Sequence, residues 1–128
     1  MFIRFAAVCF LSLLAACSNR REQIRTRLSQ ANLPELRKDA ARLYVHLRPG
    51  RAPEFIALKK TQWPESFKKL QPIRVGCYKD GFTLVMEGEA ASERGLHIVP
   101  IGMTVTPAAE SVRYEKLEEG IYWYELGK

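Results

Sequence analysis

Three side chains outside the N-terminus have a type that could do chemistry: Cys77, His46 and His97. A catalytic thiol needs a base such as His97 beside it, and a zinc site needs three or four ligands. Neither histidine has a second histidine, a cysteine pair or a carboxylate cluster at ligand spacing, and no serine lies in a Gly-x-Ser-x-Gly context. We expect no metal site, no catalytic residue and no enzyme activity. A small enzyme using Cys77 or His97 is the alternative.

The N-terminus has three zones that are typical of a secretory signal peptide. Arg4 places a charge near the N-terminal amine, residues 6–14 are apolar except for one serine, and Ala15 and Ala16 are small. The apolar run is shorter than the roughly 20 residues that a bilayer-spanning helix needs. We predict that residues 1–16 are removed on export; an uncleaved apolar helix is the alternative.

The segment Leu14-Ala15-Ala16-Cys17 closely resembles the lipobox of bacterial lipoproteins, Leu-(Ala/Ser)-(Gly/Ala)-Cys. The resemblance covers only the signal and Cys17. It implies a bacterial lipoprotein precursor that is cleaved between Ala16 and Cys17. It also implies a diacylglyceryl thioether on the Cys17 sulfur and acylation of the new amino group, with palmitate as an expected chain.

Two or three acyl chains make a stable membrane anchor, because each buried methylene contributes about 0.8 kcal/mol. By resemblance to the lipoprotein sorting rule, an Asp after the cysteine would favour the inner membrane. Ser18 stands there instead, which favours the periplasmic face of the outer membrane if the cell has one. Beyond this covalent lipid we expect no cofactor.

Positive charge is concentrated beside the predicted anchor. Residues 17–52 contain nine basic and three acidic residues, whereas residues 53–128 contain ten basic and eleven acidic residues. Near anionic lipid headgroups each Lys or Arg contributes about 1 kcal/mol, although a solvated helix face would have the same composition. Nucleic acid is not an expected partner of an exported protein. The expected headgroup contacts are Arg20, Arg21, Arg25 and Arg27.

Aromatic residues gather near the C-terminus, interleaved with glutamates. Tyr and Trp are common at binding surfaces, so Tyr114, Tyr122 and Tyr124 form the candidate binding surface for an envelope protein or a glycan. The alternative is that the tyrosines are one ordinary face of a sheet. In that alternative Ile121 and Trp123 fill the core on the opposite face, which is the expectation for Trp123.

A helix is predicted from Asn32 to Leu47. Asn32 is a good N-cap, Pro34 suits the first turn, and Glu35 stands at the capping-box position. Apolar residues then recur at helical spacing until Pro-Gly stops the helix at positions 49–50. Residues 18–31 are polar and rich in arginine, and either a tether or a helix fits them.

The strongest strand signal covers residues 73–87, where Asp80-Gly81 predicts a two-residue type I′ turn. That register pairs Cys77 with Leu84 and keeps one face apolar. Cys77 is then a small buried hydrophobe.

The other predicted elements are a short strand or extended lead-in over 55–58, a short helix over 63–70, a third strand over 96–101, and a second hairpin of 112–117 with 121–126. Pro100 favours an edge position or a strand end for the third strand.

The expected fold class is α+β, with the N-terminal helix packed on a mostly antiparallel sheet of about 4–5 strands and a second short helix. The expected organisation is a signal peptide over 1–16, a basic tether or helix over 17–31, and a small domain over 32–128. The expected function is that of an envelope lipoprotein acting as a non-catalytic binding module. The alternative is a small envelope enzyme, or an enzyme inhibitor acting through the strand face or loops.

Overall fold

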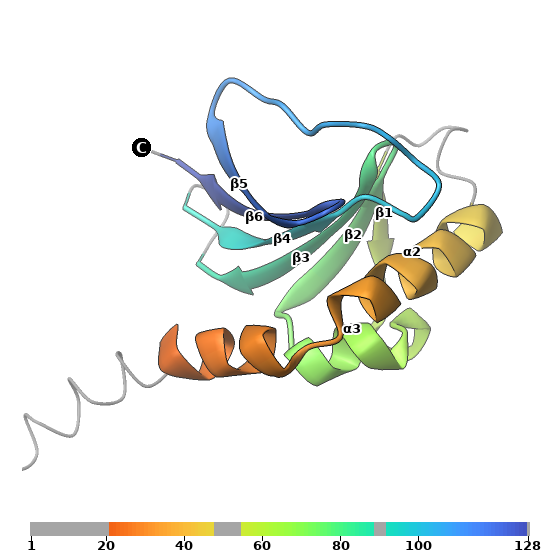
Figure 1. Ribbon diagram of the computed structural model, residues 1–128, viewed down its shortest axis with the longest axis horizontal. Helices are drawn as coiled ribbons and strands as arrows, with labels where there is room; N and C mark the ends of the chain where they lie inside the picture. The colour runs from red at the N-terminus through yellow and green to blue at the C-terminus, as the bar shows by residue number, and fades with distance from the viewer. Residues whose placement is uncertain (1–20, 48–54, 89–91, 128) are drawn as a thin grey trace, which may run out of the picture. The chain divides into compact units, whose positions relative to one another are not determined.

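The computed structural model describes residues 21–47, 55–88 and 92–127 (Figure 1). The predictions for the signal peptide, its cleavage site and Cys17 lie outside these ranges. The chain divides into two units, Met1–Ala31 and Asn32–Lys128. In the first unit residues 21–30 are helical, so this part of the basic stretch is a helix and not an extended tether. No helix in the described ranges is long and apolar enough to cross a membrane.

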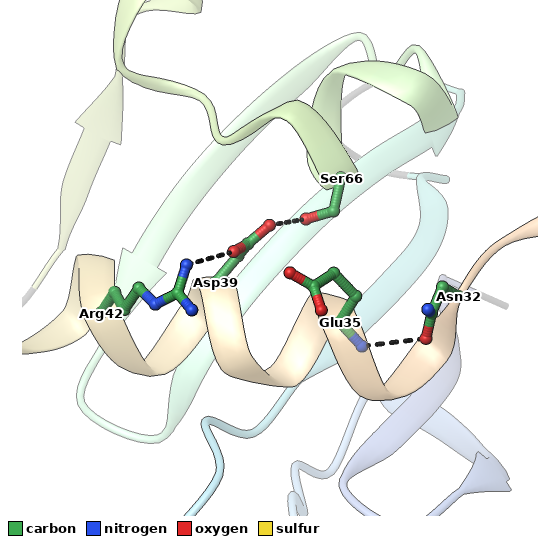
Figure 2. Close-up of polar contacts among 5 residues, drawn as sticks. All are labelled: Asn32, Glu35, Asp39, Arg42 and Ser66. Atoms are coloured by element: carbon green, nitrogen blue, oxygen red, sulfur yellow. Dashed lines mark hydrogen bonds and ion pairs between the residues drawn. The ribbon is translucent and has the colours of Figure 1, made fainter.

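Helix α2, Leu33–Leu47, begins where the capping pattern predicts. The backbone N–H of Glu35 donates to Oδ1 of Asn32 at 3.2 Å (Figure 2), so Asn32 satisfies one of the free donors at the helix start. Leu36 and Ala40 are the buried residues of the helix. The predicted helix is therefore confirmed in its position and its N-cap.

Helix α3, Glu65–Leu70, is short and begins after Pro64. Trp63, Phe67 and Leu70 are all buried, as their spacing predicts. A 3-10 turn, η1 (Lys60–Gln62), precedes it. The two helices are joined by a polar contact, in which the hydroxyl of Ser66 donates to Oδ2 of Asp39 at 2.5 Å (Figure 2).

The six strands form one sheet in which every neighbouring pair is antiparallel. Their order is β1-β2-β3-β4-β6-β5, so β1 and β5 are the edges. The strands are β1 Ile56–Leu58, β2 Arg74–Tyr78, β3 Gly81–Glu87, β4 Arg94–Ile98, β5 Val112–Glu118 and β6 Ile121–Leu126.

The predicted fold class is wrong. The sheet has six strands, not about 4–5, and it is antiparallel throughout. The first described helix of the chain covers residues 21–30 and belongs to a different unit from the sheet, so an architecture with a single N-terminal helix over the sheet does not hold. The helical elements of the sheet unit are short. The sixth strand, β1, falls in the 55–58 segment for which a short strand or an extended lead-in was expected; it has three residues and is defined by its pairing with β2.

The register of the β2–β3 hairpin also differs from the prediction. The two-residue loop is Lys79-Asp80, and Cys77 pairs with Phe82 instead of Leu84. Gly81 is the first residue of β3, with φ +138, and a Cβ there would collide with the carbonyl of Ile98 on β4. The glycine is therefore required both by its positive φ directly after the loop and by the close approach of β4. The shift moves each partner by two positions, which leaves every side chain on its predicted face.

Strand β4 is an interior strand, paired with β3 on one side and β6 on the other. Pro100 lies beyond its end at Ile98 and so removes no ladder hydrogen bond. The predicted C-terminal hairpin is present as β5 and β6, with Gly120 at φ +74 in the turn.

One face of the sheet, here called the helix face, packs against α2 and α3 (Figure 1). Phe82 lies at its centre, with its ring 5.6 Å from that of Phe67 and 6.5 Å from that of Tyr44. Arg37 of α2 donates to the carbonyl oxygens of Val99 and Pro100 at 2.9 and 3.3 Å. These contacts hold the two short helices on the same side of the sheet.

Candidate functional site

The other face of the sheet is here called the open face. It carries the side chains that alternate along each strand with those of the helix face. One row across β2, β3, β4 and β6 consists of Gly76, Thr83, His97 and Tyr122. Among the described residues, both helices of this unit lie on the opposite side (Figure 1). The open face is therefore where the domain can present side chains to a partner.

The three predicted binding tyrosines all lie on the open face but differ in how far they are buried. Tyr114 and Tyr122 are half-buried, with ring centroids 6.4 Å apart in an edge-to-face arrangement. Tyr124 is buried, and its hydroxyl donates to Oε2 of Glu93 at 2.7 Å. Burial and the Glu93 carboxylate raise the pKa of Tyr124. Tyr124 thus positions Glu93, and only two of the three rings are accessible.

Trp123 lies on the helix face, where its partner on β4 is Leu96. It is half-buried, whereas Ile121 on the same face is fully buried. The predicted face is confirmed for both residues, but Trp123 is not a full core residue. Its indole N–H donates to Oε1 of Glu125 at 3.4 Å.

His97 is the buried polar residue of the open face, with 3 % of its surface exposed. Its Nδ1 lies 3.2 Å from the hydroxyl of Thr83, and its Nε2 lies 3.5 Å from Oδ2 of Asp80. Nε2 nevertheless makes no hydrogen bond of good geometry. Burial lowers the pKa of His97, and the Asp80 charge opposes that effect only in part. The imidazole is therefore neutral at pH 7.

The contacts from Thr83 to His97 and from His97 to Asp80 place a hydroxyl, an imidazole and a carboxylate in the order found in hydrolases. A hydrolase also needs backbone N–H donors aimed at the developing oxyanion. Strand β3 is paired with β2 and with β4 along Thr83 and its neighbours, so their backbone groups are taken up by the two ladders. His97 is also buried away from solvent. The Thr83–His97–Asp80 contacts therefore fit a structural role.

Cys77 and His97 are not brought together. Cys77 lies on the helix face opposite Phe82, is fully buried and has no disulfide partner. Burial, with a smaller contribution from Asp80, raises the pKa of the Cys77 thiol to about 12. A thiol with this pKa is unreactive at neutral pH. In the described ranges, no group of three or more His, Cys, Asp or Glu side chains is placed to hold a metal ion.

Two further aromatic residues of the open face were missed by the sequence prediction. Phe55 and Tyr78 have ring centroids 4.9 Å apart with their planes tilted by 38°. They are 46 % and 41 % exposed, which makes them the most accessible rings of this face. A Cβ on Gly76 would collide with the Phe55 ring, so this glycine lets the ring lie against the sheet. Phe55 comes beside Tyr78 only through the β1–β2 pairing, for which the sequence has no clear signal.

The sheet curls around the open face. Tyr78 on β2 and Tyr114 on β5 are separated by three strands in the sheet order, yet the Tyr78 hydroxyl contributes to the raised pKa of Tyr114. The rings of His97 and Tyr114 are also only 6.0 Å apart, although β6 lies between their strands. Curvature of this kind brings the rings of both sheet edges toward one another, and the side chains between them, such as His97 and Tyr124, are buried.

The predicted headgroup-binding residues belong to the first unit. Arg21 and Arg25 are exposed and Arg27 is half-buried on the helix of residues 21–30, and Arg20 lies outside the described ranges.

Comparisons of the chain with protein-family models, with curated proteins and with solved structures find no significant match.

Proposed function

We propose that the protein is a lipid-anchored component of the bacterial cell envelope whose folded unit binds a partner non-catalytically through the open face. The observation that supports the binding part is the pair of exposed rings, Phe55 and Tyr78, on the open face. Exposed aromatic rings are common at binding surfaces, because each ring removes a large apolar area from water when it is covered.

The anchoring part of the proposal depends on Leu14-Ala15-Ala16-Cys17 and on the charge next to it. Arg21 and Arg25 are exposed on a helix that follows the motif closely in the chain. Positive side chains near a lipid anchor add electrostatic attraction to anionic headgroups, and a chain with two such signals stays on the membrane.

The anchor is tested by labelling the protein in a bacterial host with a clickable palmitate analogue and fractionating the cells. We expect the label on the wild type in the membrane fraction and its loss in Cys17→Ser. The matched control is Cys9→Ser, which lies in the predicted signal and should keep the label. Unlabelled wild-type protein in the soluble fraction would refute the anchor.

The binding face is tested with a photo-crosslinking amino acid at position 78 and, as a control, at position 45. Val45 is 72 % exposed and lies on α2, away from the open face. We expect position 78 to give a defined crosslinked product in intact cells and position 45 to give none. Identical products from both positions would show that the open face has no specific role.

A further inference from the structure

A dense group of lysines lies on the solvent side of η1 and α3. Between positions 59 and 69 the chain has four lysines and one glutamate. Phe67 and Leu70 are the buried residues of α3, so its lysines are left on the solvent side, and all four lysines of the segment are exposed. We call this group the basic patch; it consists of Lys59, Lys60, Lys68 and Lys69.

The positive charge of the basic patch is not cancelled by its surroundings. Lys68 lies 3.4 Å from Glu65, but 79 % of the glutamate side chain is exposed, and an exposed ion pair of this kind is weak. Among the described residues, Lys59, Lys60 and Lys69 form no ion pair. The patch therefore presents a concentrated positive charge to whatever lies against α3.

The β5–β6 hairpin of the same unit carries the opposite charge. Between positions 112 and 126 there are four glutamates and two basic residues. An anionic surface attracts the basic patch and repels this hairpin, so the charge distribution gives the folded unit a preferred orientation at such a surface.

The predicted anchor keeps the folded unit close to a surface of this kind. The helix of residues 21–30 spans about 15 Å, and residues 18–20 and 31 add at most about 14 Å when fully extended. The start of the folded unit at Asn32 then lies within about 30 Å of the lipid on Cys17. A tether of this length holds two surfaces at an effective concentration on the order of millimolar, so even a weak electrostatic contact forms.

We propose that the folded unit docks through the basic patch on the anionic lipid headgroups of the leaflet that holds its anchor. This inference rests on the proposed function, because it needs the lipid on Cys17. Helices α2 and α3 lie on the opposite side of the sheet from the open face (Figure 1). Docking through α3 therefore turns the open face, with Phe55 and Tyr78, away from the membrane and toward a partner.

The test is energy transfer in the full-length lipoprotein, reconstituted in vesicles that contain a rhodamine-labelled lipid as acceptor. A donor dye is attached to a cysteine introduced by Thr61→Cys beside the basic patch or by Tyr78→Cys on the open face. Thr61 is exposed and Cys77 is fully buried, so the dye reacts with the introduced thiol.

The lipid composition and the salt concentration separate docking from simple anchoring. We expect transfer from position 61 to increase when phosphatidylglycerol replaces part of the phosphatidylcholine, and to exceed transfer from position 78. The increase should disappear at about 1 M salt, where the screening length falls to about 3 Å, although the protein still floats with the vesicles.

The paired substitution Lys68→Gln with Lys69→Gln removes half of the basic patch. Each lysine near an anionic surface changes the ratio of docked to undocked protein about fivefold, so this variant should lower the ratio about 25-fold. The matched control is Arg113→Gln with Lys116→Gln, which removes two exposed charges from β5. Lys116, like Lys68, is paired with a glutamate three residues away. The control should keep the transfer of the wild type, and thermal unfolding of both variants establishes that they are folded.

Three results would overturn the docking: equal transfer from position 61 in the two kinds of vesicle, equal losses in the two paired variants, or higher transfer from position 78 than from position 61. The last would place the open face against the membrane. A protein that gives one of these results and floats with the vesicles keeps its anchor. A protein that stays in solution with both kinds of vesicle would refute the anchor, and with it the proposed function.

Discussion

The Nε2 atom of His97 lies 3.5 Å from Oδ2 of Asp80 without a hydrogen bond of good geometry, and the imidazole is almost completely buried. Thr83 and Tyr114 also face the ring, through a 3.2 Å contact with Nδ1 and an edge-to-face ring contact. Because burial outweighs the Asp80 charge, the pKa of His97 in the folded protein is below its ordinary value of 6.5. The folded state therefore binds a proton at this site less readily than the unfolded state.

The first prediction is that acid weakens the fold through His97. Above pH 6.5 the residue is neutral in both states and its full contribution to stability is present. As the pH falls below 6.5 the unfolded chain takes up a proton first, so the free energy of unfolding decreases by at most about 1.4 kcal/mol per pH unit. Urea unfolding at pH 7, 6 and 5 measures the decrease.

His97→Gln removes the titrating group and should flatten the pH dependence between 7 and 5. A wild type whose stability stays constant or rises on acidification would contradict the argument that burial dominates at His97.

The second prediction concerns the contact between the two helices. Ser66 donates to Asp39 at 2.5 Å, and the Asp39 side chain is 15 % exposed (Figure 2). Ser66→Ala leaves that carboxylate with one partner fewer and should cost about 1–2 kcal/mol of stability. Arg42→Ala removes the exposed ion pair of Asp39 and should cost about 0.5 kcal/mol or less. Equal losses in the two variants, measured by urea unfolding, would show that Ser66 does not join the helices.

The third prediction is that Gly95 tolerates no side chain. A Cβ at this position would collide with the backbone carbonyl of Leu84 on β3, at the irregularity between Val85 and Glu87. Backbone inside a sheet cannot yield as a flexible side chain can, so Gly95→Ala should cost about 3 kcal/mol. Gly102→Ala is the control, because its surroundings are open and only its φ of +93 opposes a Cβ; it should cost about 1 kcal/mol. Equal melting temperatures for the two variants would contradict the packing argument.

The fourth prediction is that Cys77 is inert in the folded protein. Because burial raises the pKa of its thiol to about 12, the thiolate that reacts with an alkylating reagent is scarce at pH 8. Iodoacetamide labelling of the peptide that contains Cys77, followed by mass spectrometry, should be on the order of a hundredfold slower in the native protein than in urea. Comparable rates would show that the thiol is accessible and would reopen a catalytic role.

Local patterns in the sequence predicted the elements that local chemistry controls. The N-cap of Asn32, the buried side of α3 and the position of the β5–β6 hairpin follow from capping, helical spacing and turn residues. The hairpin register failed because Asp80-Gly81 has two uses. The pair resembles a type I′ turn, but Gly81 is required by the approach of the Ile98 carbonyl on β4, which no local pattern records.

The residues of the candidate site likewise divide into those that local patterns predict and those that only the tertiary structure places. The alternation of β6 determined that Tyr122 and Tyr124 share a face. The resemblance of Leu14-Ala15-Ala16-Cys17 to a lipobox, the lone thiol of the folded unit and the basic residues after Cys17 are read from the sequence alone. Only the tertiary structure decided that Tyr124 is buried against Glu93, that Phe55 lies beside Tyr78, and that curvature brings Tyr78 and Tyr114 toward each other. The physical reason is that strand order and sheet curvature arise from contacts between residues far apart in the chain, whereas caps, turns and face alternation depend on near neighbours.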